Sequence, residues 1–102
     1  MVLHMVLLKI RKSVGKPKVA KVMNSIGALK KVIPGIVAFE WGAYSSPEGL
    51  NKGFTHGFCM MFKTAKARDG YLIHPEHEKV KTGVLALLDG GIDAVIAFDF
   101  VA

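Results

Sequence analysis

The sequence contains a single cysteine, Cys59, so it cannot form an intrachain disulfide. Chains without disulfides are typical of reducing compartments, and we expect a cytoplasmic location. Long hydrophobic runs are also absent. None approaches the roughly 18 residues that a membrane-spanning helix needs, so we expect no membrane contact. The first residues, Met1-Val2-Leu3-His4, lack the basic leader and cleavage site of a secretory signal.

Acidic residues are missing from the first third of the chain. Residues 1–39 hold eight Lys or Arg and no Asp or Glu, whereas residues 40–102 hold six against eight, and the net charge is +6. Such a segment could attract an anionic substrate or a nucleic acid. The lysines are not interleaved with the aromatic residues that a single-strand binder uses for stacking, which argues against nucleic acid. We interpret four of them as a solvated helix face: Lys18, Lys21, Lys30 and Lys31.

The length of 102 residues fits one domain, spanning residues 1–102. Apolar residues make up 51% of the chain, well above the content of a disordered segment, so we expect a folded domain. At this size one hydrophobic core is thin, and burial against a partner chain would add stability.

Apolar spacing and turn residues divide the chain into seven elements. Period-two patterns predict strands, and spacings of three and four predict helices. Pro17 and Pro75 suit the first turns of two helices, and Thr64 suits the cap of a third. The predicted strands are 2–10, 36–41, 54–62 and 93–101, and the predicted helices are 16–33, 64–73 and 75–89. The order β-α-β-β-α-α-β is that of the ferredoxin-like, split β-α-β fold, an α+β class with a four-stranded antiparallel sheet.

Both faces of this sheet are predicted to be apolar. His4, Val6, Leu8 and Ile10 alternate with Leu3, Met5 and Leu7, and Cys59 and Met61 extend the second set on another strand. Helices cover only one face of a ferredoxin-like sheet, which leaves the second set bare. An apolar patch of this kind favours a partner, and a two-fold homodimer is the commonest solution.

Three histidines and one tyrosine are predicted to point toward the interior. His4 and His56 share strand faces with large apolar residues. His77 heads the helical stripe of Val80, Val84, Leu87 and Leu88. Tyr71 lies on the inner side of its helix. Each buried ring needs a hydrogen-bond partner, which a pocket with water or ligand would supply. Each could equally be a satisfied structural residue. Antiparallel pairing places His4 and His56 at opposite ends of their strands, so we do not expect them side by side.

Other site classes have little support. His74-Pro75-Glu76-His77-Glu78 has ligand-like content, but it is not an H-E-x-x-H helix and no third spaced ligand follows. We therefore expect no metal site. Cys59 lies in mid-strand, where a thiol acts as a small hydrophobe and not as a nucleophile.

Five segments together carry a family resemblance that extends over essentially the whole chain. They are His4 to Lys9, Ile33-Pro34 with Trp41-Gly42, Gly53-Phe54-Thr55-His56, Tyr71-Leu72-Ile73-His74-Pro75-Glu76-His77, and Phe98-Asp99-Phe100. On these motifs the sequence resembles the stress-responsive A/B barrel domain, or Dabb, family. The resemblance implies a ferredoxin-like homodimer in which two sheets pack as an α+β barrel.

The resemblance extends to the pocket of the family's olivetolic acid cyclase, a lyase that closes a linear poly-β-keto chain by intramolecular aldol condensation without a cofactor. It implies His77 as general base, Tyr71 as its hydrogen-bonding partner, and a keto compound as ligand. One departure is Ile26, which replaces a pocket tyrosine. Other family members have no settled catalytic role, so a non-enzymatic stress-response or assembly protein is the alternative. The substrate-binding residues implied are His4, His56, Val6, Leu8, Met23, Ile26, Phe58 and Leu72.

Overall fold

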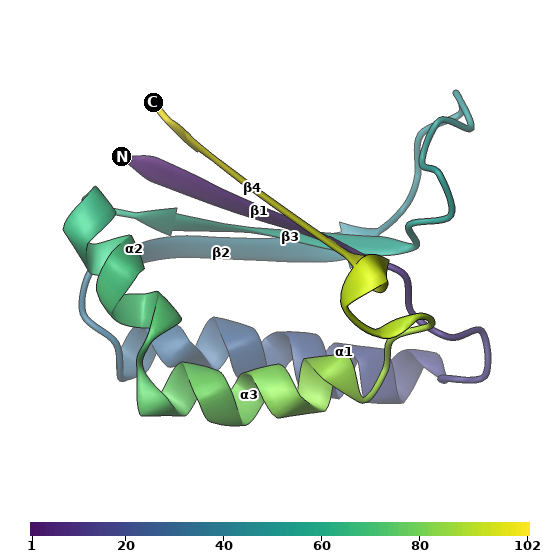
Figure 1. The fold of residues 1–102 in the computed structure, drawn as a ribbon, viewed down its shortest axis with the longest axis horizontal. Helices are drawn as coiled ribbons and strands as arrows, with labels where there is room; N and C mark the ends of the chain where they lie inside the picture. Colours follow the sequence, from purple (N-terminus) through teal and green to yellow (C-terminus); the bar gives the residue numbers. More distant parts are fainter.

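Four strands form one antiparallel sheet in the order β2-β3-β1-β4 in the computed structural model, which describes residues 1–102. Strand β1 lies at the centre and pairs with β3 on one side and β4 on the other (Figure 1). The chain termini lie close together, and the backbone N–H of Ala102 donates to the carbonyl of Met1. The strands are β1 (Val2–Leu8), β2 (Ile36–Ala43), β3 (His56–Phe62) and β4 (Val95–Val101).

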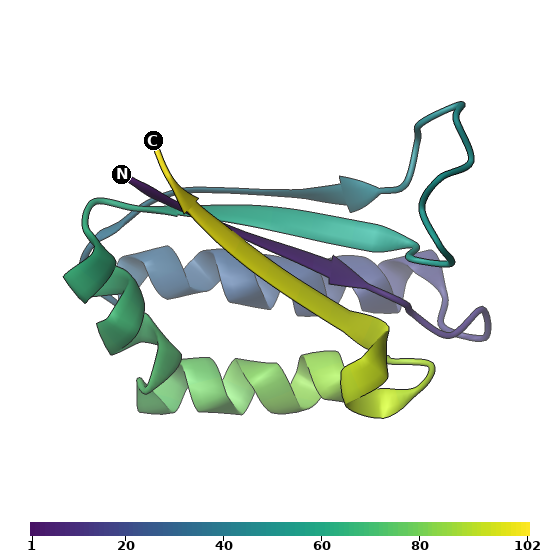
Figure 2. The ribbon, with the colours of Figure 1, turned by 45° about the horizontal axis from the view of Figure 1, so that its top comes forward.

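All helices lie on one face of the sheet (Figures 1 and 2). Helix α1 (Lys16–Gly27) continues as the 3-10 helix η1 (Ala28–Lys31). Helix α2 (Ala65–Leu72) is capped by Thr64, whose side chain accepts a hydrogen bond from the backbone N–H of Ala67. His74 is the N-cap residue of helix α3 (Pro75–Leu85), and the 3-10 helix η2 (Gly91–Ala94) leads into β4.

The predicted ferredoxin-like α+β fold is confirmed, but several element boundaries differ from the predictions. Strand β1 ends at Leu8, and Ile10 makes only an isolated bridge with Leu88. Helix α3 ends at Leu85, short of the predicted end at residue 89. The next turn uses Gly90 and Gly91 at φ values of 117° and 61°, a left-handed conformation that other residues rarely adopt. This turn delays the start of β4 to Val95.

Helix α1 packs closely on the sheet and supplies much of the core. It buries Val19, Val22, Met23 and Ile26. Gly27 makes the approach possible, because a Cβ atom at this position would lie 2.8 Å from the ring of Phe39 on β2. Helix α3, in contrast, buries none of its residues completely. Helix α1 is therefore packed tightly on this face of the sheet, whereas α3 covers it more loosely.

The opposite face of the sheet carries no helix (Figure 1). The pairing of β1 with β4 places Met5 opposite Phe98, and Phe98 is 64% exposed. This bare face is formed by Leu3, Met5, Leu7, Cys59, Met61, Ile96, Phe98 and Phe100. The alternation of β1 and β3 predicted such a face, and β4 adds three large side chains to it. Each helix of the chain falls short of the length and apolar character needed to cross a membrane.

Candidate functional site

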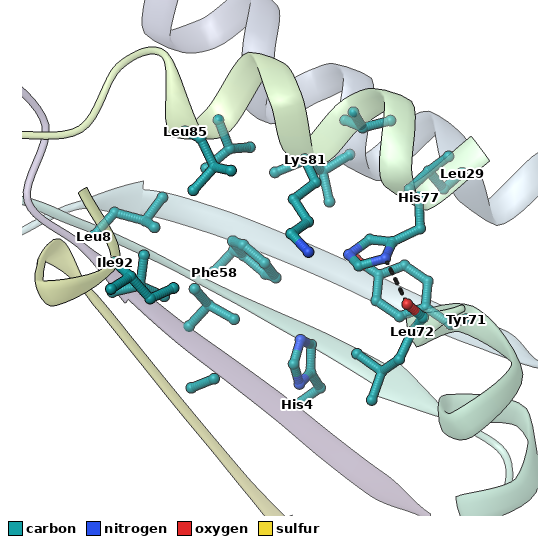
Figure 3. A pocket seen from close by; sticks show the side chains of 16 residues that line it. His4, Leu8, Leu29, Phe58, Tyr71, Leu72, His77, Lys81, Leu85 and Ile92 are labelled. Carbon is teal, nitrogen blue, oxygen red and sulfur yellow. Dashed lines mark hydrogen bonds between the residues drawn. The ribbon is translucent and has the colours of Figure 1, made fainter. Parts of the chain in front are cut away.

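A cavity of about 270 Å³ lies between the sheet and helix α3 (Figure 3). Sixteen residues line it, of which thirteen are hydrophobic. They come from β1, β3 and β4 on the sheet side, and from α1, η1, α2, α3 and η2 on the other side. The cavity is therefore a pocket with apolar walls and a few polar groups, an arrangement typical of small-molecule sites.

The pocket exists because α3 contacts the sheet incompletely. Val80 and Val84 on its inner face are only half-buried, although they have the helical spacing of core residues. After the end of α3 the chain joins the hydrophobic core, where Leu87 and Leu88 are buried. Ile92, which is 76% exposed, lies at the rim. The predicted inward stripe is thus divided between pocket wall and core.

His77 is positioned by the junction of α2 and α3. The side chain of His74 caps α3 by accepting a hydrogen bond from the backbone N–H of Glu76, and Pro75 occupies the first turn. The imidazole of His77 donates from Nδ1 to the carbonyl oxygen of Leu72 at 3.3 Å, which leaves Nε2 unprotonated in the neutral ring (Figure 3). Burial lowers the pKa of His77 and outweighs the hydrogen bond to Leu72 and the charge of Glu78, which raise it. The ring is therefore neutral at pH 7 and can accept a proton.

Tyr71 lies against His77, with ring centroids 4.2 Å apart and an angle of 39° between the planes. The side chain is almost fully buried, and burial raises its pKa to about 12. Its hydroxyl makes no hydrogen bond within the chain. Every fully enclosed polar side-chain atom does have a partner, so this hydroxyl is not fully enclosed. The hydroxyl therefore retains access to solvent, and because Tyr71 lines the pocket it is available to donate a hydrogen bond to a ligand.

His4 belongs to a hydrogen-bonded chain of side chains that joins β1, β4 and α2. Its Nδ1 lies 2.6 Å from Oδ1 of Asp99, and the other carboxylate oxygen accepts from Nη1 of Arg68 at 2.8 Å. Burial alone would raise the pKa of Asp99, but the hydrogen bonds from Arg68 and His4 outweigh it and lower the pKa. Asp99 therefore stays ionised and fixes the orientation of the His4 ring beside the pocket.

Lys81 adds a charged side chain to the lining. It lies four residues after His77, one turn further along α3, and its side chain extends into the cavity (Figure 3). The neighbouring carboxylate of Glu78 is 3.7 Å from its Nζ atom. No Asp or Glu is among the lining residues.

Most of the residues implied as site residues lie together around this pocket, but two do not. Met23 of α1 is fully buried in the core and does not line the cavity. His56 pairs with Leu8, whereas His4 pairs with Met60, so the two histidines lie four residues apart along the sheet. Nδ1 of His56 contacts Oγ1 of Thr55 at 2.8 Å. The eight that line the cavity are His4, Val6, Leu8, Ile26, Phe58, Tyr71, Leu72 and His77.

Sequence reasoning did not assign Asp99, Arg68 or Lys81 to the site. Asp99 stands between Phe98 and Phe100, and a lone carboxylate on the inner face of an apolar strand was a usable signal. Its partner could not be found without the β1–β4 register. Lys81 could have been predicted, because it lies four residues after His77 and residues four apart share one face of a helix. Arg68 had none, since only the fold brings α2 beside β4.

The remaining candidates do not form a second reactive centre. No three His, Cys, Asp or Glu side chains lie together in a way that could hold a metal ion. Cys59 lies in β3 on the bare face, and burial raises the pKa of its thiol. The thiol is therefore protonated and weakly nucleophilic at neutral pH.

The sequence model of the stress responsive A/B barrel domain (Dabb) matches residues 2–102. The chain belongs to the Dabb family. Among proteins with curated descriptions, none matches the sequence. A crystal structure of a protein from Arabidopsis thaliana is similar, with 29% identity and a TM-score of 0.90 over 100% of this chain and 95% of the other.

Two other solved structures share the fold of this Dabb domain at lower identity. A dimeric ferredoxin-like protein of unknown function from Jannaschia sp. CCS1 is 23% identical, with a TM-score of 0.88 over 99% of this chain and 98% of the other. The hydroxynitrile lyase of Passiflora edulis is 16% identical, with a TM-score of 0.85 over 99% and 92%. The fold is therefore one that hosts an enzyme in at least one organism.

Proposed function

We propose that this Dabb domain is a cofactor-independent enzyme that transfers protons on a small keto compound, with His77 as the base. The reaction proposed is the intramolecular aldol condensation of a poly-β-keto thioester. One observation carries the proposal: a neutral imidazole, held by a backbone carbonyl, faces an apolar pocket beside an unpaired tyrosine hydroxyl.

The chemistry begins at a carbon that lies between two carbonyl groups. Such a carbon is acidic, and Nε2 of His77 removes one of its protons to give an enolate. The hydroxyl of Tyr71 donates a hydrogen bond to the oxygen on which the negative charge develops. The enolate carbon then attacks a second carbonyl of the same molecule, and the imidazolium returns its proton to the new alkoxide. These steps give the cyclic β-hydroxy carbonyl adduct, and loss of one water molecule from it completes the condensation. Neither step needs a cofactor.

The distribution of polar groups around the pocket indicates how a substrate would lie. His4, Tyr71 and His77 gather at one end, whereas Leu8 and Ile92 lie at the other (Figure 3). A dicarbonyl unit at the polar end leaves an alkyl chain for the apolar end. Ile26 lines the wall without a hydroxyl, so the substrate's orientation depends on the remaining polar groups.

The working assembly we propose is a homodimer that joins the bare faces of two sheets. Eight mostly apolar side chains form this face, and Phe98, in the middle of the edge strand β4, is exposed in the single chain. Burial of apolar surface contributes about 25 cal/mol per Å², so pairing two such faces is favourable. The dimeric Jannaschia protein of the same fold supports this assembly.

Turnover of short poly-β-keto thioesters tests the proposal. Wild type should form a cyclic product, and His77→Ala should abolish turnover while thermal melts show a folded protein. The alternative is a non-enzymatic protein in which these residues are structural. It predicts no turnover by wild type and a lower melting temperature for His77→Ala, because a buried, hydrogen-bonded imidazole is lost.

A further inference from the structure

The charge of the pocket is set by one side chain. Among the sixteen lining residues, Lys81 is the only lysine or arginine, and no carboxylate lies beside it in the wall. The carboxylate of Asp99 is already occupied, since Oδ1 contacts His4 at 2.6 Å and Oδ2 contacts Arg68 at 2.8 Å. The pocket therefore presents a positive charge without a counterion of its own.

The nearest carboxylate outside the wall compensates this charge only weakly. Nζ of Lys81 is 3.7 Å from Oε2 of Glu78, which exceeds a hydrogen-bond distance, and the two side chains are 49% and 54% exposed. Exposed pairs of this kind contribute little. Lys79, two residues before Lys81, differs because it does not line the pocket and pairs with Glu76 at 3.2 Å.

From this arrangement we infer that the pocket selects ligands that carry a carboxylate, and that Lys81 is the residue that determines this selectivity. The inference rests on the proposed function and narrows its ligand: a keto acyl chain with an apolar body that carries a free carboxylate in addition to its thioester, in preference to the same chain with a neutral amide in place of that carboxylate. The apolar walls bind the body, and the ammonium group of Lys81 binds the carboxylate. Charge-assisted hydrogen bonds of this type are stronger than neutral ones.

The same geometry links ligand binding to the base. The titratable groups that influence His77 or lie against it are Glu78 and Lys81 on α3, Tyr71 on α2 and His4 on β1. Burial is the main cause that lowers the pKa of His77; the hydrogen bond to Leu72 and the charge of Glu78 oppose it in part, and the charge of Lys81 lowers the pKa again. A bound carboxylate neutralises that charge. The pKa of His77 should therefore rise on binding, and this rise should require Lys81.

Calorimetry with two probes of matched shape, octanoate and octanamide, tests the inference at pH 7.5 on the full chain. Wild type should bind octanoate about two- to fivefold more tightly than octanamide, the range expected for a partly solvated ion pair. Lys81→Met should bind both probes equally, and Lys81→Arg should keep the preference. Lys79→Met is the matched control on the same helix, and it should behave as wild type.

Each contrary result has a separate meaning. Equal affinities in wild type, or a preference that survives in Lys81→Met, would overturn the selectivity assigned to Lys81 and leave the proposed pocket intact. Failure of wild type to bind either probe would contradict the proposed ligand-binding function itself. NMR titration of His77 with and without octanoate adds an independent readout, because an unchanged pKa in wild type would also overturn the inference.

Discussion

The imidazole of His77 lies on the ring of Tyr71, with centroids 4.2 Å apart. Tyr71 in turn packs against Phe62 of β3 at 5.0 Å, and Phe62 is fully buried. The orientation of the proposed base is therefore set by the hydrophobic core and by the carbonyl of Leu72, not by a mobile loop. A base held in this way needs no reorganisation before it accepts a proton.

Removal of the Tyr71 hydroxyl should slow the reaction without unfolding the protein. Tyr71→Phe keeps the ring that packs on His77 and deletes only an oxygen that has no partner within the chain. We expect kcat for a poly-β-keto thioester to fall by about 10²-fold, within the usual range for loss of one hydrogen bond to a developing oxyanion. The melting temperature should be unchanged. A fall in stability with unchanged kcat would show that the hydroxyl is structural.

Asp99→Asn should lower the free energy of unfolding at pH 7 by about 1–2 kcal/mol, because charge-assisted hydrogen bonds at a partly open site are lost. The pKa of Asp99 is lowered in the folded protein, so its contribution is present above the usual carboxyl pKa and disappears as the pH falls through the folded value. The difference between variant and wild type should therefore shrink below about pH 4. Denaturant titrations at pH 3 and pH 7 measure it.

Asp69→Asn is the matched control for this experiment. Asp69 accepts from the same arginine, Arg68, at 2.8 Å, but its side chain is 67% exposed. An exposed pair contributes about 0–1 kcal/mol. Equal losses for the two variants would contradict the special role of Asp99 in holding His4.

The positive charges of Lys18 and Lys21, in the basic first third of the chain, should matter little for stability or ligand binding. Lys18 and Lys21 are exposed on α1 and form no ion pair. Reversing both to Glu should change the free energy of unfolding by less than about 1 kcal/mol in total, as is usual for surface substitutions. Affinity for a short RNA and for octanoate should not change either. A large, salt-dependent loss of RNA binding would instead identify this helix face as a nucleic-acid site.

The bare face should hold the dimer together. Wild type should sediment near twice the chain mass of 11.1 kDa. Phe98→Asp places a charge on this face, in the middle of the edge strand β4, and should give a folded monomer, since Phe98 is 64% exposed in the single chain. Val32→Asp, at an exposed position on the helical side, is the control and should remain dimeric. A wild-type monomer at micromolar concentration would refute the assembly.

Local patterns predicted the fold and part of the site because they depend on neighbours in sequence. The alternation along β1 placed His4 inward, and the stripe of α3 placed His77 inward. The rest depends on contacts between distant segments. Asp99 contacts His4 because the register of β1 with β4 places the two residues opposite each other. His56 shares a face of β3 with Phe58, but it is the first residue of the strand and lies beyond the pocket. Lys81 reaches the cavity because α3 stands off from the sheet, which helical spacing alone does not reveal.

The exchange of α-protons is the most direct test of His77 as the base, because it isolates the first chemical step. A short β-keto thioester is dissolved in D2O, and NMR follows deuterium incorporation at the carbon between its carbonyls. Wild type should accelerate exchange above the buffer rate, with a rate that falls only as the pH drops below 6.5, the usual pKa of histidine, because burial lowers the pKa of His77. His77→Ala should return to the buffer rate while remaining folded. Equal exchange rates for wild type and His77→Ala would contradict the account.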